Sequence, residues 1–223
     1  MKAMILAAGR GERLRPLTDH TPKPLLQAGK YRLIEYLIQD LVKAGIADII
    51  INYAHLGEQF PSVLGDGERY GATLRYSPEP EGGLETAGGI IKALPLLGNE
   101  PFLIVNGDIW TDFSFERLIN SNLKPDTLCR LVMVANPSHN PNGDFALTES
   151  GHLAINGDTK YTYSGIGVYQ PALFTSYEPQ RLALKSVLLQ AIEAQSAKAI
   201  YYQGQWSDIG TIERLEQLKL QLS

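Results

Sequence analysis

The sequence predicts an α/β fold, with a mixed, mostly parallel β-sheet covered by helices on both faces. Two observations support this prediction. Short β-type runs alternate with segments of helical periodicity along the first half of the chain, which is the order that parallel strands require. The first run also ends in a glycine-rich loop, at the edge where ligands bind on sheets of this kind.

The elements follow from the apolar pattern, taken in chain order. Residues 2–8 form the first β-type run. Apolar residues at 33, 34, 37, 38, 41 and 42 recur at helical spacing, and Gly45 follows as a natural stop for a helix over 33–44. The same reasoning predicts further strands at 48–53, 74–76, 102–106, 128–135 and 161–169, and further helices at 59–64, at 90–97 and after 211.

Composition limits the function classes. The chain has 223 residues, 44% of them hydrophobic and 20% charged, which predicts one globular domain with a large core. A net charge of −4 argues against nucleic acid as the main partner. The single cysteine, Cys129, forms no internal disulfide and is expected to be buried, and no apolar run is long enough to span a membrane. We therefore expect a cytoplasmic protein, either a monomer or a weak homodimer.

The loop over residues 9–24 is predicted to bind phosphate. Glycine lets backbone N–H groups approach phosphate oxygens, and the cations Arg10, Arg13, Arg15 and Lys23 surround the glycines. The alternative is a tight turn with solvated basic residues. The loop does not match the P-loop pattern, and Leu14 stands where a dinucleotide-binding fingerprint needs its third glycine.

Two later segments place polar groups beside predicted strands. Residues 79–89 lead into a helix, where Thr86 either binds the edge of a base or simply caps the helix. Asp108 follows a buried apolar strand and a glycine, so its carboxylate is placed either to hold a hard cation or to form a turn.

The second half of the chain offers weaker signals. Residues 136–145 form a polar loop with two prolines, and glycine within the strand over 161–169 indicates close approach of a ligand or another backbone segment. His139 and His152 show no metal-ligand spacing, so we expect both at the surface. Asp208, taken by itself, is expected to support the start of the closing helix.

Residues 6–24 resemble the signature L-A-A-G-x-G-x-R-L-x-P-L-T-x-x-x-P-K-P of the sugar-1-phosphate nucleotidyltransferases, with every fixed residue present. The segments V-N-G-D and W-S-D-I-G-T also match this family. The resemblance implies the Rossmann-like fold of nucleotide-diphospho-sugar transferases, as a single domain over 1–223. It also implies a nucleotide-binding part at about 1–110 and a sugar-binding part at about 111–223.

The resemblance also implies roles for particular residues. It implies a Mg²⁺ ion held by Asp108 and Asp208. The catalytic residues that it implies are Arg13, Lys23, Asp108 and Asp208. The implied nucleotide-binding residues are Ala7, Ala8, Gly9, Gly11, Arg13, Lys23, Glu79, Thr86, Ala87 and Gly88. The implied sugar-binding residues are Asn106, Asp144 and Gly165.

The loop spelling L-E-T-A-G-G-I resembles the muramate-type branch of the family. That branch implies UTP and N-acetylmuramic acid 1-phosphate as substrates, and UDP-N-acetylmuramic acid and pyrophosphate as products, in recycling of cell-wall sugar. The alternatives are glucose 1-phosphate with UTP or dTTP, mannose 1-phosphate with GTP, a noncatalytic nucleotide-sugar sensor, and a nicotinamide oxidoreductase. The lactyl carboxylate of muramate needs a cation or amide donors, for which Lys160 and Lys185 are both candidates.

Overall fold

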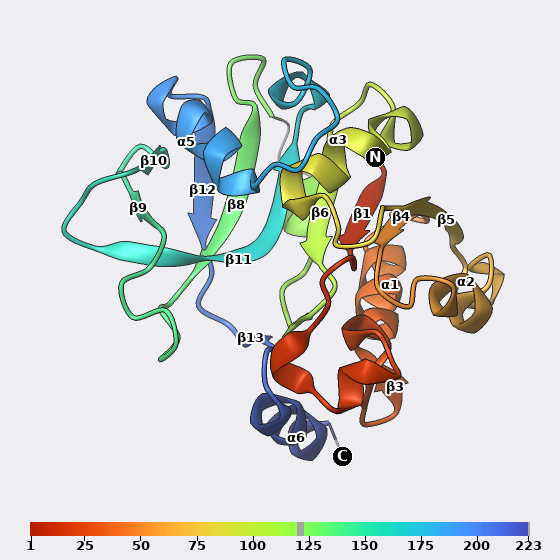
Figure 1. The fold of residues 1–223 in the computed structure, drawn as a ribbon. Helices are drawn as coiled ribbons and strands as arrows, with labels where there is room; N and C mark the ends of the chain where they lie inside the picture. The colour runs from red at the N-terminus through yellow and green to blue at the C-terminus, as the bar shows by residue number, and fades with distance from the viewer. Residues whose placement is uncertain (120–122, 223) are drawn as a thin grey trace.

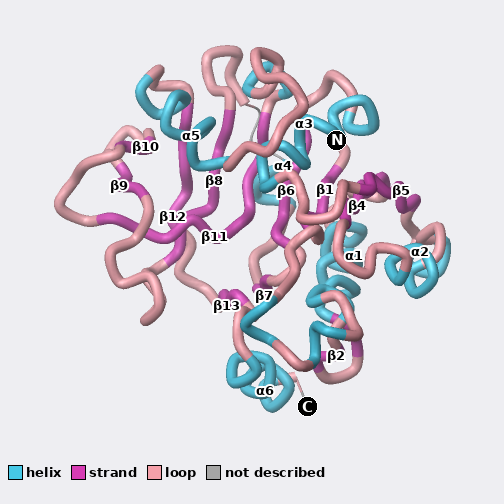
Figure 2. Tube along the Cα trace, viewed as in Figure 1, coloured by secondary structure: helices cyan, strands magenta, loops and turns pink. Residues whose placement is uncertain are grey.

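The computed structural model describes residues 1–119 and 123–222. The main sheet has the strand order β10-β9-β11-β6-β1-β4-β5, with β8 paired to β11 and β12 paired to β8 (Figures 1 and 2). The strands are β1 (Ala3–Leu6), β2 (Gln27–Ala28), β3 (Tyr31–Arg32), β4 (Asp48–Tyr53), β5 (Thr73–Pro78), β6 (Phe102–Asn106), β7 (Ile109–Thr111), β8 (Cys129–Val134), β9 (Phe145–Leu147), β10 (Leu153–Ala154), β11 (Lys160–Tyr169), β12 (Ala197–Tyr201) and β13 (Trp206–Asp208).

The α-helices are α1 (Leu33–Lys43), α2 (Gln59–Leu64), α3 (Glu85–Leu97), α4 (Glu116–Ile119), α5 (Leu184–Glu193) and α6 (Ile212–Gln221). Short 3₁₀ turns are η1 (Glu12–Leu14), η2 (Leu17–Asp19), η3 (Lys23–Leu25), η4 (Glu68–Tyr70) and η5 (Pro171–Leu173).

The centre of the sheet is parallel, as the sequence predicts. In β1, Met4 lies opposite Ile50 of β4 and Ile104 of β6. These three residues pack with α3 on one face of the sheet, whereas Ala3 and Ile5 pack with α1 on the other. Because successive side chains of a strand point to opposite faces, a strand covered on both faces is apolar throughout.

The second half of the chain makes the sheet mixed. Strand β11 runs antiparallel to β6 and β8, and its register with β8 shifts between Tyr163 and Gly167. The first residues of β11, Lys160 and Tyr161, pair with β9. Cys129 is buried at the start of β8, as predicted.

The start of helix α3 differs most from the sequence prediction. Helix α3 begins at Glu85 instead of residue 90, and its N-cap residue is Leu84, so the capping role considered for Thr86 is wrong. The backbone of Leu182 explains the early start, because its C=O accepts hydrogen bonds from the N–H groups of Ala87 (2.9 Å) and Gly88 (3.1 Å). A distant segment thereby satisfies N–H groups that a helix start leaves without partners.

The closing helix α6 lies beside the segment that follows β1 (Figure 1). Leu215 and Leu218 of α6 share an apolar cluster with Leu14 and Leu26. Within the described ranges, no helix is both long and apolar enough to cross a membrane.

Candidate active site

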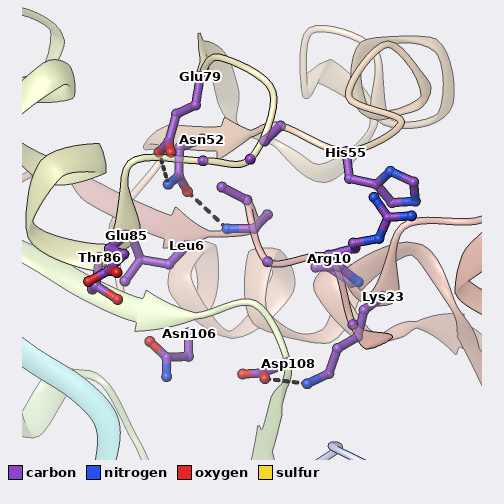
Figure 3. A pocket seen from close by; sticks show the side chains of 18 of the residues that line it. Leu6, Arg10, Lys23, Asn52, His55, Glu79, Glu85, Thr86, Asn106 and Asp108 are labelled. Atoms are coloured by element: carbon purple, nitrogen blue, oxygen red, sulfur yellow. Dashed lines mark hydrogen bonds and ion pairs between the residues drawn. The ribbon is translucent and has the colours of Figure 1, made fainter. Parts of the chain in front are cut away.

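A cavity of about 640 Å³ lies at the carboxyl ends of the central parallel strands (Figure 3). The predicted residues Ala7, Ala8, Gly9, Gly11, Lys23, Glu79, Thr86, Asn106 and Asp108 line it, together with Arg10 of the predicted phosphate loop. The lining also includes Asn52, His55, Glu85 and Arg181, which the sequence did not single out. The parallel arrangement explains the location, since loops that leave the same edge of a sheet converge.

Asn52 connects three of these loops. Its Oδ1 accepts a hydrogen bond from the Ala7 N–H at 2.9 Å, and its Nδ2 donates to Glu79 at 2.6 Å (Figure 3). The other carboxylate oxygen of Glu79 accepts from the Leu84 N–H at 2.7 Å. Because Asn52 is only 2% exposed, leaving its polar groups unpaired would be costly, so this network fixes the loop conformation.

Lys23 and Asp108 form an ion pair on the opposite side of the cavity (Figure 3). Lys23 begins the turn η3, after Pro22, and is only 8% exposed. Asp108 follows β6, where the Gly107 N–H donates to Leu6 O at 2.8 Å and holds the turn against β1. A buried ammonium is tolerated when a carboxylate pairs with it, and this pair lines the cavity.

Asp208 is distant from Asp108 in the sequence, but the backbones of the two residues lie side by side in the fold. Strand β13 pairs with β7 so that Asp208 is opposite Ile109, and the Ile209 N–H donates to Asp108 O at 2.7 Å. The Asp208 carboxylate contacts Arg214 at 2.5 Å and His139 at 3.0 Å. His139 is exposed, as expected, but its contact with Asp208 was not foreseen.

A second cavity of about 400 Å³ adjoins the first. Glu85, Thr86 and Asn106 line both cavities, and Asp144 and Tyr163 line only the second. The Tyr163 N–H donates to the Asp144 carboxylate at 2.8 Å. Burial raises the pKa of the Tyr163 phenol well above its ordinary value, so this hydroxyl stays protonated near neutral pH.

Gly165, a predicted sugar-binding residue, lines neither cavity. It has a φ of +81°, and a Cβ there would lie 2.5 Å from Nδ2 of Asn106. The glycine therefore makes room for the Asn106 side chain, which lies between the two cavities.

Three predicted nucleotide-site residues lie outside the cavity lining: Arg13, Ala87 and Gly88. The N–H groups of Ala87 and Gly88 are occupied by Leu182 O, and a Cβ on Gly88 would lie 2.2 Å from Gln180 O. The Arg13 guanidinium lies near Gly210, where an added Cβ would be 3.0 Å from its Nη2. Arg13 is thereby placed on the Asp208 side of the site.

The carboxylates of Asp108 and Asp208 have the chemistry that Mg²⁺ prefers, and the β7–β13 pairing brings their backbones together. Within the described part of the chain, no group of three or more His, Cys, Asp or Glu side chains is arranged for a metal ion. Two carboxylates are nevertheless compatible with Mg²⁺, because this ion commonly takes one or two protein carboxylates and completes its shell with water and phosphate oxygens.

Comparison with known proteins agrees with this geometry. A family model described as nucleotidyl transferase matches residues 2–223. The chain is 48% identical to N-acetylmuramate alpha-1-phosphate uridylyltransferase of Neisseria meningitidis serogroup B (strain ATCC BAA-335 / MC58), over 97% of this chain and 96% of that protein. It is 28% identical to mannose-1-phosphate guanyltransferase beta-A of Xenopus laevis, of which it spans 61%.

Solved structures show the same fold. A Bacillus anthracis protein assigned as a glucose-1-phosphate thymidylyltransferase superposes with a TM-score of 0.86 and 21% identity, over 100% of this chain and 95% of that one. HddC from Yersinia pseudotuberculosis, complexed with GMP-PN, superposes with a TM-score of 0.82 and 19% identity, over 100% and 99%. The nearly full-length family match and the 48% identical relative show that this chain belongs to the nucleotidyl transferase family.

Proposed function

We propose that this enzyme joins UTP and N-acetylmuramic acid 1-phosphate to give UDP-N-acetylmuramic acid and pyrophosphate, in recycling of cell-wall sugar. The observation that supports this function best is the 48% identity to a uridylyltransferase of that specificity over nearly the full length of both chains. The two adjoining cavities provide separate volumes for a nucleotide and a phosphorylated sugar, with Thr86 and Asn106 between them.

The chemistry requires positioning and charge neutralisation more than proton transfer. A sugar 1-phosphate is largely dianionic near neutral pH, since its second pKa is about 6, so its oxygen needs no general base to attack. In-line attack on the α-phosphorus forms the new P–O bond and breaks the bond to the pyrophosphate leaving group. In this proposal, Lys23 lies between the two reacting phosphates, and Arg10 and Arg13 stabilise the charge of the triphosphate.

In the proposed mechanism, Asp108 and Asp208 would hold Mg²⁺, which neutralises phosphate charge when bound. The proposal includes a cytoplasmic location and a monomer or weak homodimer.

A competition experiment tests the substrate pair. Muramate, N-acetylglucosamine, glucose and mannose 1-phosphates are each supplied with UTP, dTTP, GTP and ATP, and pyrophosphate release is measured. We expect the highest kcat/KM for the muramate and UTP pair. A higher value for mannose 1-phosphate with GTP would favour the activity named for the 28% identical relatives and overturn the proposed specificity. Nucleotide binding without pyrophosphate release from any pair would instead indicate a sensor.

A further inference from the structure

The charged residues that line the second cavity are Glu85, Asp144 and Lys185. Both carboxylates have partners within the protein. Glu85 accepts from Nε of Arg181 at 3.1 Å, and Asp144 accepts from the Tyr163 N–H at 2.8 Å. The Lys185 side chain, by contrast, makes no ion pair or hydrogen bond among residues 1–119 and 123–222.

The position of Lys185 explains why it lacks a local partner. It is the second residue of α5, and the residues one helical turn further along, Leu188 and Leu189, are not acidic. The first turn of α5 contains no acidic residue. A cation near a helix N-terminus is electrostatically unfavourable, so Lys185 does not improve the stability of α5. Lys185 is an exposed residue that lines the cavity, so a ligand anion there can reach its side chain.

We propose that Lys185 is a specificity-determining residue that binds the lactyl carboxylate of N-acetylmuramic acid 1-phosphate. This inference rests on the proposed function. The acceptor has two anionic groups, the phosphate on C1 and the carboxylate of the lactyl ether on C3, and two separated anions need two separated cations. Lys23 lines only the first cavity and Lys185 lines only the second. A sugar placed beside Asn106 and Thr86, which line both, can direct its phosphate to Lys23 and its lactyl group to Lys185.

The structure distinguishes Lys185 from the other nearby cations. Lys160, at the start of β11, lines neither cavity, and its C=O accepts a hydrogen bond from Asn136 at 3.0 Å. Arg181 lines the first cavity and is already paired with Glu85. Lys185 is therefore the cation that matches the acceptor carboxylate in both location and lack of a competing partner.

The test uses Lys185→Met with Lys160→Met as a matched control, since both variants remove the same charge and keep a long unbranched side chain. Initial rates of pyrophosphate release are measured with UTP and either muramate or N-acetylglucosamine 1-phosphate. A charge-assisted hydrogen bond contributes about 1.5–3 kcal/mol, so Lys185→Met should lower kcat/KM for the muramate substrate by about 10- to 100-fold. The loss should occur mainly in KM. The rate with N-acetylglucosamine 1-phosphate should stay within about twofold of wild type, and so should both rates of Lys160→Met.

Calorimetric binding of UDP-N-acetylmuramic acid and UDP-N-acetylglucosamine gives the same comparison without turnover, and Lys185→Arg should restore binding of the muramate product. Equal losses for both sugars, or no loss for either, would overturn the role of Lys185. The wild-type enzyme tests the proposed function separately: if it prefers an acceptor without a carboxylate, the proposed specificity fails first, whatever the variants do.

Discussion

Among single residues, Lys23 combines low exposure with a position in the lining of the first cavity. Its ammonium pairs with Asp108 at the boundary of this cavity, and in the proposed function anionic substrates would also contact it. Lys23→Ala should lower the rate of the chemical step by about 10²-fold or more, because it removes charge stabilisation of the transition state. Single-turnover quench measurements give this rate, and nucleotide titration gives the binding constant. A chemical step at the wild-type rate would contradict the proposed role.

Asp108 has two expected functions, pairing with Lys23 and holding Mg²⁺. Asp108→Asn preserves the shape of the side chain and one oxygen that accepts from Lys23, so the fold should persist. The amide is a poor ligand for Mg²⁺, and turnover should fall by about 10²-fold or more. Steady-state rates across a Mg²⁺ titration, with circular dichroism as the control for folding, test this prediction. Near-normal turnover of Asp108→Asn with Mg²⁺ supplied would refute the metal assignment.

At the level of elements, the start of α3 depends on contact with the segment at residues 180–182. Gly88→Ala places a Cβ 2.2 Å from the backbone O of Gln180 and 2.9 Å from the Cβ of Leu84, and neither atom can move away easily. Overpacking of this kind costs about 1–3 kcal/mol, so Tm should fall by about 2–4 °C for each kcal/mol.

Gly9→Ala is the matched control, because a Cβ on Gly9 meets nothing within 4 Å. Its Tm should equal that of wild type, while the KM for the nucleotide should rise because the methyl group projects where phosphate approaches the backbone. Thermal unfolding by scanning calorimetry, with steady-state kinetics on the same preparations, separates the two effects. Equal Tm values for the two variants would show that the contact with residue 180 is unimportant.

Glu35 joins α1 to the turn η4 and makes stability dependent on pH. Burial alone raises the pKa of Glu35, but hydrogen bonds from Tyr70 and the Arg32 N–H, with the charges of Arg32 and Arg69, outweigh it, so the pKa is lowered from 4.5. Because the folded pKa lies below the unfolded one, the stabilisation is fully present above about pH 4.5. It is lost as pH falls through the lower folded value.

Glu35→Gln should therefore reduce the free energy of unfolding at neutral pH by about 1.5–3 kcal/mol and have less effect in acid. Asp40, also in α1, has a pKa raised by burial and contributes with the opposite sign. The difference between wild type and Glu35→Gln cancels that contribution. Urea unfolding at a series of pH values from 3 to 7 gives the required curves, and a difference that does not shrink below about pH 4.5 would contradict the prediction.

In the whole molecule, the two halves share their apolar clusters. One cluster contains Met4 and Ile104 with Val187, and the other contains Ile5 and Val105 with Ile166. Strand β6 pairs with β1 on one side and β11 on the other, so neither half has a complete sheet. We predict that the nucleotide and sugar parts unfold together.

Urea unfolding should give one transition, with the same midpoint by far-UV circular dichroism and by fluorescence. The fluorescence reports on Trp110 in β7 and Trp206 in β13, the strand pair beside Asp108. A separate fragment of residues 1–110 should remain unfolded, because β6 would lose β11 and expose one edge and one apolar face. Two separated transitions would show that the halves are independent units.

Much of this architecture is local in origin and could be predicted from the sequence. The uninterrupted apolar runs of β4 and β6 indicate buried parallel strands, and the spacing in α1 indicates a helix covering one face. The loop after β1 contains Gly9 and Lys23, and Asp108 closely follows β6. Because β1 and β6 are parallel, the fold class alone places these three residues at the same edge of the sheet.

Other features depend on segments that only the folded chain brings together. Asn52 reaches Ala7, 45 residues away in the sequence, and the Leu182 carbonyl takes the N–H groups of Ala87 and Gly88 that the loop spelling suggested for the nucleotide. Lys160 and Lys185 are equivalent candidates in the sequence, and only the folded chain places one of them at the cavity. Periodicity and spelling describe contacts within a few residues, whereas partners across the site depend on sheet register and on which buried polar groups find hydrogen bonds.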